Sequence, residues 1–220
     1  MPLKLYYAPG TCSLVPHIAL ELIGQPFEAQ LVKMHKGEHR SPEFLAVNPA
    51  GQVPVLQDGD ETITQIIAIT LYLDALHPQA GLFPQELLAR THAIETLAWL
   101  NNTVHTTFNR VFKPEGAVDG EEMQAAVRAK GKQGYAALME RLQDKVVAAR
   151  AAGNDYLNGA SIGVVDAYAL TVIRWSQLGG MVPEQQWPQL WDYAERVAAQ
   201  PAAQRAMERE RIRLRAQPLV

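Results

Sequence analysis

The sequence predicts a small α/β domain followed by a domain built only from helices. In the first eighty residues, short strand-like runs alternate with segments whose apolar residues have helical spacing. Beyond residue 86, apolar residues recur only at helical spacing. We therefore expect an α/β domain at residues 1–80 and an all-helical domain at residues 87–220, joined by a linker that contains two prolines and a glycine.

The first strand and the first helix are predicted at the start of the chain. Residues 3–7 (LKLYY) are strand-like, and a Pro-Gly turn signal ends them. Apolar residues at helical spacing follow, so we expect a helix whose N-cap is Ser13 and which Gly24 ends.

The remaining elements of the α/β domain follow from turn signals and alternation. Thr64 is predicted to cap the last helix, which carries Ile66, Ile69, Leu73 and Leu76 at helical spacing. The order βαβαββα, with a crossover between the early strands, implies a mixed sheet packed between helices. Strands are expected at 27–32, 53–56 and 61–64, and a short helix at 42–47.

The second domain is predicted as a helical bundle. Apolar residues from Ile94 to Val111 mark one face of a long helix, which the segment KPEG at 113–116 ends. The segment 164–178 is strongly apolar and is expected at the centre of the bundle. Further helices are expected at 121–150, 188–200 and 201–215.

Composition and charge exclude several classes of protein. The 220 residues carry a net charge of −3, which disfavours nucleic-acid binding because phosphates require a basic surface. The single cysteine, Cys12, excludes an internal disulfide and a cysteine-based metal site, and suits a reducing compartment such as the cytoplasm. There is no signal-peptide pattern, and no apolar run approaches the ~20 residues of a membrane helix. We expect a cytoplasmic protein with no metal and no membrane contact.

Three segments carry sequence motifs. They are LYYAPGTCSLVPH at 5–17, NPAGQVPVL at 48–56, and VDAY followed by RW within 165–175. The first closely resembles the N-terminal motif of bacterial beta-class glutathione transferases. The second resembles the NPxGxVPxL segment of the cytosolic glutathione transferase superfamily, and the third is similar to its ADAY…RW helix. The resemblance covers nearly the whole chain.

The resemblance implies a thioredoxin-like first domain that binds glutathione as co-substrate, and a homodimer. It implies a second substrate, a small hydrophobic electrophile, held between the domains. The Val53-Pro54 bond is expected to be cis, so that the backbone of Val53 faces the cysteinyl unit of glutathione. The polar loop 36–42, which carries Lys36, His39 and Arg40, resembles theta-like members, in which a basic residue meets the glycyl carboxylate. The glutathione-binding candidates are Lys36, His39, Gln52, Val53, Pro54, Gln65 and Ile66.

Cys12 is the first candidate for catalysis. It precedes a predicted helix, and free N–H groups at a helix N-terminus favour a thiolate. Such a thiolate can exchange with a glutathione disulfide. Alternatively, Cys12 and Ser13 donate hydrogen bonds that keep glutathione itself ionised. A buried structural cysteine is the third interpretation.

His105 is the second candidate, and two departures from the family pattern accompany it. The resemblance places the histidine close to the cysteine, where an imidazole can accept a thiol proton; Asn101, one turn earlier, shares its face. Thr106 stands where relatives carry a basic residue. Ile66 stands where relatives carry a serine that binds the γ-glutamyl carboxylate. Without that hydrogen bond, the free energy of glutathione binding is expected to be about 1.5–3 kcal/mol less favourable.

Three functions remain open on the sequence alone. They are a transferase, a glutathione-dependent disulfide reductase or peroxidase acting through Cys12, and a binding scaffold without catalysis.

Asp166 is assigned to folding, with Gly163 at the cap position of its helix. Phe108 and Phe112 are candidates for lining the electrophile site, and the arginine-rich segment 205–215 is interpreted as a solvated helix face.

Overall fold

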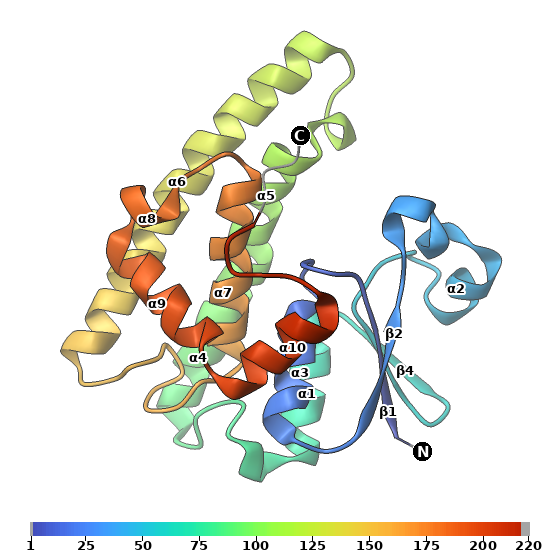
Figure 1. Cartoon of the computed structure of the whole chain (residues 1–220), viewed down its shortest axis with the longest axis vertical. Helices are drawn as coiled ribbons and strands as arrows, with labels where there is room; N and C mark the ends of the chain where they lie inside the picture. The colour runs from blue at the N-terminus through green and yellow to red at the C-terminus, as the bar shows by residue number, and fades with distance from the viewer. Residues whose placement is uncertain (1, 217–220) are drawn as a thin grey trace.

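The computed structural model describes residues 2–216 and has the two-part architecture that the sequence predicts (Figure 1). An α/β part packs its helices against a larger helical part, and one hydrophobic core runs through both. The outer ends of the two expected domain ranges, residue 1 and residues 217–220, lie outside the described residues.

The four strands form a mixed sheet in the order β2-β1-β3-β4. β1 pairs in parallel with β2, and β3 pairs antiparallel with β1 and β4, which confirms the predicted crossover. The third strand begins at Val55 rather than Val53, because Pro54 has no N–H to donate to a strand ladder. The strands are β1 (Leu3–Tyr7), β2 (Phe27–Leu31), β3 (Val55–Asp58) and β4 (Glu61–Thr64).

Two helices, α1 (Leu14–Ile23) and α3 (Ile66–Leu76), lie between the sheet and the helical part (Figure 1). α1 packs against α3 and against two helices of the helical part, α7 (Val164–Leu178) and α10 (Pro201–Glu210), so it is buried along most of its length. Gly24 ends it in the left-handed conformation, as predicted. The short α2 (Pro42–Val47) lies away from the helical part, and Ser41 caps it by accepting from the Phe44 N–H.

The long helix predicted around residues 94–111 is interrupted by one π-helical turn, Leu100–Val104. Such turns insert an extra residue into a helix and are frequent at functional sites. His105 is the first residue of the helix that follows. The helices of this part are α4 (Leu87–Trp99), α5 (His105–Phe112), α6 (Glu121–Ala151), α7 (Val164–Leu178), α8 (Pro183–Gln186), α9 (Pro188–Ala198) and α10 (Pro201–Glu210).

Three details of the helices differ from the sequence prediction. The last helix ends at Glu210 instead of Arg215, because Arg211 adopts a left-handed conformation with φ of 55°. Leu76 is 44% exposed and does not belong to the buried face of α3. The short α8 was not predicted, because a helix of so few residues does not show helical spacing in the sequence.

Asp166 holds the start of α7 in the centre of the helical part. Its carboxylate accepts hydrogen bonds from the N–H of Leu157 and of Gly163, both at 2.8 Å, and from the Tyr193 hydroxyl. Burial raises the pKa of this carboxyl to about 6, so at neutral pH it remains ionised and can serve all three donors. Its role in folding, assigned from the sequence, agrees with these contacts. No helix within residues 2–216 has both the length and the apolar character needed to cross a membrane.

Candidate active site

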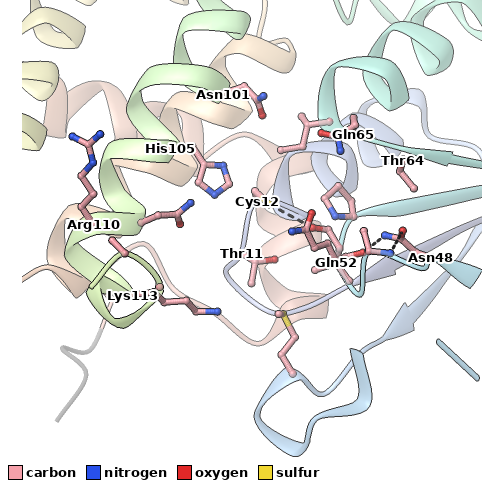
Figure 2. Close-up of a pocket in the computed structure, with 18 residues that line it drawn as sticks. Thr11, Cys12, Asn48, Gln52, Thr64, Gln65, Asn101, His105, Arg110 and Lys113 are labelled. Atoms are coloured by element: carbon pink, nitrogen blue, oxygen red, sulfur yellow. Dashed lines mark hydrogen bonds between the residues drawn. The ribbon is translucent and has the colours of Figure 1, made fainter. Parts of the chain in front are cut away.

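A cavity of about 600 Å³ lies between the two parts of the molecule. One wall comes from the α/β part: the loop before α1, the turn before β3 and the start of α3. The opposite wall comes from the π-helical turn, α5 and the segment after it (Figure 2). Cys12 and His105 face one another across this cavity from different walls.

Cys12 lies in the loop directly before α1, and its Sγ is 3.7 Å from the carbonyl oxygen of Val53. Its side chain keeps some surface open to the cavity. Burial nevertheless raises the pKa of the thiol to about 12, and the nearby backbone N–H lowers it only in part. The thiolate that the helix N-terminus favours is therefore not the resting form. The loss of solvation on burial raises the pKa of the thiol by more than the N–H groups lower it.

Ser13 does not line the cavity. It is fully buried, and its hydroxyl lies 3.1 Å from both the N–H and the carbonyl of Ala8 and 2.8 Å from the Thr11 hydroxyl. It is the N-cap residue of α1, as predicted, but its side chain makes no capping hydrogen bond to the helix. Its contacts fix the shape of the loop that carries Cys12, which is a positioning role.

His105 lines the cavity with a neutral imidazole, because burial lowers its pKa to about 4. Its Nδ1 is 2.8 Å from the Tyr168 hydroxyl, which in turn donates to Asn101 Oδ1 at 3.1 Å. Since the single tyrosine proton is used toward Asn101, the network assigns the His105 proton to Nδ1. Nε2 is then unprotonated and can accept a proton.

The start of α3 lines the cavity with Gln65 and Ile66, next to Thr64. Thr64 belongs to β4 and does not cap the helix; Gln65 is the N-cap and has a φ of 71°, unusual for a residue other than glycine. Strain of this kind often accompanies ligand binding. Ile66 is 5% exposed and lines the cavity, and its N–H is one of the unpaired donors of the first turn.

The hydroxyl that Ile66 lacks gives a direct prediction. Ile66→Ser is expected to raise the affinity for glutathione by about ten- to a hundredfold, because one hydrogen bond to a carboxylate contributes about 1.5–3 kcal/mol. Calorimetric titration of both proteins measures the change. Ile66→Ala is the matched control, because it removes the same side chain without adding a donor; equal affinities for the serine and alanine variants would contradict the prediction.

The other glutathione-binding candidates divide into two groups. Gln52, Val53 and Pro54 line the cavity, and the Val53-Pro54 bond is cis as expected. Asn48, which the sequence analysis passed over, fixes this turn by donating to the Gln52 carbonyl at 2.7 Å. Lys36 and His39 do not reach the cavity, and the only described residue of their loop that does is Met34. The loop winds into two 3₁₀ turns, Met34–Lys36 and Glu38–Arg40, which the sequence did not predict.

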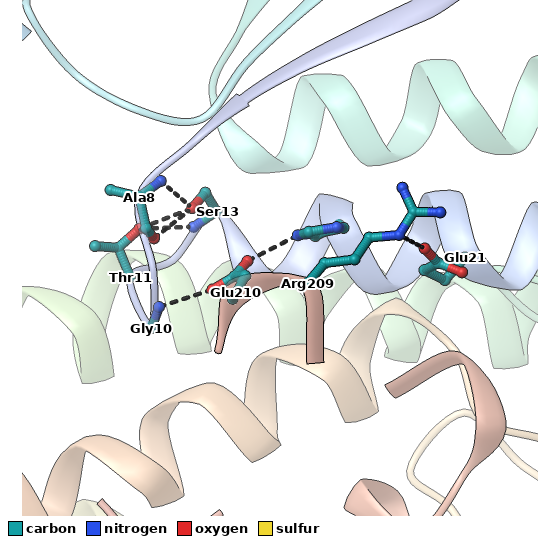
Figure 3. A network of polar contacts seen from close by, with 8 residues as sticks. Ala8, Gly10, Thr11, Ser13, Glu21, Arg209 and Glu210 are labelled. Atoms are coloured by element: carbon teal, nitrogen blue, oxygen red, sulfur yellow. Dashed lines mark hydrogen bonds and ion pairs between the residues drawn. The ribbon is translucent and has the colours of Figure 1, made fainter. Parts of the chain in front are cut away.

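A buried carboxylate from the far end of the chain supports the Cys12 loop (Figure 3). Glu210 is 2% exposed; it accepts from the Gly10 N–H at 2.7 Å and from His17 Nδ1 at 2.8 Å. Trp175 Nε1 donates to the Gly10 carbonyl at 2.8 Å. The arginine-rich segment is therefore not simply a solvated face. Nothing local in the sequence could reveal a contact between residues 200 positions apart.

Glu210→Ala is expected to lower the free energy of unfolding by about 2–5 kcal/mol, because it leaves the buried His17 imidazole and the partly buried Gly10 N–H without their partner, and an unpaired buried donor costs about 1–3 kcal/mol. Urea denaturation followed by circular dichroism measures this. Glu208→Ala is the control, since Glu208 is an exposed carboxylate on the same helix. Losses of similar size in both variants would show that Glu210 does not support the loop in this way.

The chain matches one protein family in both of its parts. Residues 1–75 match the family described as glutathione S-transferase, N-terminal domain, and residues 100–201 match glutathione S-transferase, C-terminal domain. The chain therefore belongs to the glutathione S-transferase family.

Individual relatives agree with this assignment. The chain is 33% identical over 177 residues to glutathione S-transferase GstA of Escherichia coli O157:H7, which is 79% of this chain and 82% of that protein. It is 31% identical over 180 residues to human glutathione S-transferase theta-1, covering 79% and 72% of the two chains. Among solved structures, a sphingomonad glutathione S-transferase complexed with glutathione has a TM-score of 0.78 at 32% identity, covering 96% of this chain and all of that one.

Proposed function

We propose that this protein is a beta-class-like glutathione transferase that joins the sulfur of glutathione to a small electrophile. A bacterial beta-class enzyme of Sphingomonas chungbukensis, with 30% identity and a TM-score of 0.79, supports the class. In this proposal the protein is a cytoplasmic homodimer, residues 1–80 bind glutathione, and residues 87–220 help to hold the electrophile.

The α/β wall of the cavity suits glutathione. The unpaired N–H groups at the start of α3 can bind the γ-glutamyl carboxylate, because a helix N-terminus favours anions. The backbone of Val53, next to the cis bond, can pair with the cysteinyl unit. The glutathione sulfur then lies near Cys12 and His105, which line the same cavity.

One observation carries the proposed chemistry: Cys12 and His105 line the same cavity. Burial raises the pKa of the thiol to about 12 and lowers the pKa of the imidazole to about 4, which favours the neutral form of both. A thiol can donate a hydrogen bond to the thiolate of glutathione and so favour its ionised form. The imidazole Nε2 can accept the proton that glutathione loses. The thiolate attacks the electrophile, the new S–C bond forms, and the displaced group leaves with its electron pair.

The same observation argues against the reductase or peroxidase alternative. With its pKa raised to about 12 by burial, the Cys12 thiol stays protonated at pH 7. Disulfide exchange needs the thiolate as nucleophile. A scaffold without catalysis is the remaining alternative, favoured by Ile66 and Thr106, and an activity assay separates it from the transferase.

The test is conjugation of glutathione to 1-chloro-2,4-dinitrobenzene, followed by absorbance. His105→Gln is expected to lower kcat/KM by no more than about 10²-fold at pH 7, the lower end of the range for a general base, because an imidazole with a pKa lowered to about 4 is a weak base. His92→Gln is the control, because His92 is exposed and does not line the cavity. No conjugation by the wild-type protein would refute the transferase function.

The pH dependence of this variant gives an independent check. The pKa of His105 is lowered to about 4, so its basic form is present above that value and is lost as the pH falls toward it. The ratio of wild-type to variant rates is therefore expected to stay constant from pH 8 to pH 5.5 and to fall only below pH 5. A ratio that falls near pH 6.5 would show that His105 titrates as an exposed histidine does.

A further inference from the structure

The helical wall of the cavity is not lined by aromatic rings, contrary to the sequence prediction. Phe108 and Phe112 were the candidates for an apolar lining, but Phe108 is 4% exposed in the core and stacks on Phe112, and neither lines the cavity. Asn101 and His105 are among the polar residues that line it, and both come from the same wall (Figure 2). The chemistry of this wall therefore depends on how its polar side chains are hydrogen-bonded.

A chain of hydrogen bonds joins these two side chains through the core. His105 Nδ1 is 2.8 Å from the Tyr168 hydroxyl, which is 3.1 Å from Asn101 Oδ1. Tyr168 is fully buried, and burial raises the pKa of its hydroxyl, so the hydroxyl keeps its proton at neutral pH. Asn101 Nδ2 donates to Asn102 Oδ1 at 2.9 Å, which leaves the amide oxygen of Asn101 directed to the tyrosine.

The Asn101 oxygen decides the direction of the whole chain. A tyrosine hydroxyl has one proton, and an amide oxygen is an acceptor only, so the Tyr168 proton is committed to Asn101. His105 Nδ1 must then carry a proton of its own to bond to the same hydroxyl. If the Asn101 oxygen were absent, the hydroxyl would be free to donate to Nδ1, and the ring proton would move to Nε2.

The π-helical turn Leu100–Val104 places both ends of the chain against one hydroxyl. The His105 N–H bonds to the carbonyl of Leu100, five residues back, so this turn holds one residue more than an α-helical turn. Asn101 lies inside the turn and His105 directly follows it, while α7 holds Tyr168 in the core. The local departure from α-helical geometry thus coincides with the two residues that share the tyrosine.

We propose that Asn101 is a positioning residue that acts through Tyr168 to keep Nε2 of His105 unprotonated and ready to accept the proton of glutathione. This inference rests on the transferase function proposed above. In the proton transfer the S–H bond of glutathione breaks, a bond forms between that proton and Nε2, and the electron pair stays on the sulfur. The imidazolium keeps its Nδ1 proton toward Tyr168 and releases the Nε2 proton to solvent.

The protonated ring nitrogen of His105 can be measured directly. Long-range proton–nitrogen correlation spectra of isotope-labelled protein at pH 7 distinguish the two tautomers of a neutral imidazole, and the His105 signals are those that disappear in His105→Gln. We expect the Nδ1–H tautomer in the wild-type protein and in Asn101→Asp, which retains an acceptor oxygen. We expect mainly the Nε2–H tautomer in Asn101→Leu, which has none.

Conjugation of glutathione to 1-chloro-2,4-dinitrobenzene gives a signature that a merely structural role would not produce. Asn101→Leu is expected to lower kcat/KM by about tenfold, the effect of one hydrogen bond. The double variant Asn101→Leu/Tyr168→Phe is expected to be at least about threefold more active than Asn101→Leu, because no hydroxyl then donates to Nδ1. Thr103→Ala is the control and is expected to match the wild type, since Thr103 is exposed on the same π-helical turn and does not line the cavity.

Two results would overturn the inference and leave the transferase function standing. The first is an Nε2–H tautomer in the wild-type protein, which needs no variant to fold, or a tautomer that Asn101→Leu does not change. The second is a double variant no more active than Asn101→Leu, because in a structural role the second lost contact only adds to the damage of the first. Absence of conjugation by the wild-type protein refutes the transferase function, and the role of Asn101 with it.

Discussion

Cys12→Ala is expected to lower kcat/KM for glutathione conjugation by about ten- to a hundredfold, while Cys12→Ser stays within a few-fold of wild type. The neutral thiol lies at the cavity and acts, in the proposed mechanism, only as a hydrogen-bond donor to the glutathione thiolate. A hydrogen bond to a charged group contributes about 1.5–3 kcal/mol. Serine retains a donor of similar reach, whereas alanine has none, and Ser13 is too deeply engaged with Ala8 to replace it. Steady-state kinetics at pH 7 measures both variants.

The opposite pattern would identify Cys12 as a nucleophile. If the serine variant loses as much activity as the alanine variant, a hydrogen-bond donor is not sufficient. Mass spectrometry of wild-type protein incubated with oxidised glutathione provides a second reading. We expect little mixed disulfide at pH 7 and a rate that rises about tenfold per pH unit through pH 10, because the pKa of the thiol is about 12.

Asp166→Ala is expected to cause the largest loss of stability, a fall in the free energy of unfolding of at least about 3 kcal/mol. The carboxylate serves the N–H groups of Leu157 and Gly163 and the Tyr193 hydroxyl, all of which lose their partner in the variant. The Gly163 N–H and the Tyr193 hydroxyl are buried and the Leu157 N–H is partly buried; a buried donor left unpaired costs about 1–3 kcal/mol. Chemical denaturation measures the loss if the variant folds, and failure to purify as a folded monomer or dimer would be its extreme form.

Asp192→Ala provides the control for this prediction. Asp192 lies on α9 beside Tyr193, but its side chain is exposed, so its removal is expected to change stability by less than about 0.5 kcal/mol. A loss below about 1 kcal/mol for Asp166→Ala would mean that water replaces the carboxylate and that the start of α7 does not depend on it.

The element order could be predicted from the sequence because it depends on local signals. Alternation and helical spacing placed nearly every strand and helix, and Gly24 marked a helix end that the structure contains. Signals that compete locally produced the errors. Ser13 takes the cap position of α1 as predicted, but its hydroxyl bonds to Ala8 and not to the helix. Thr64 remains in β4, and Gln65 takes the cap position of α3.

The candidate site was only partly predictable, because much of it depends on contacts between distant segments. The motifs brought Cys12, Val53 and Pro54 to one cavity, and His105 joins them from the other part of the molecule. The protonation of Cys12 could not be read from a helix N-terminus, since burial decides it. The support from Glu210 depends on α10 packing against α1, which no short motif encodes.

The central claim is that this chain binds glutathione in the cavity between its two parts, although Ile66 removes a hydroxyl from the site. Isothermal titration of the purified wild-type protein with reduced glutathione at pH 7 tests this most directly. We predict one site per chain with a dissociation constant between micromolar and low millimolar values, and weaker binding at high salt. No heat of binding at glutathione concentrations several times a millimolar level, from a protein shown to be folded, would contradict the account.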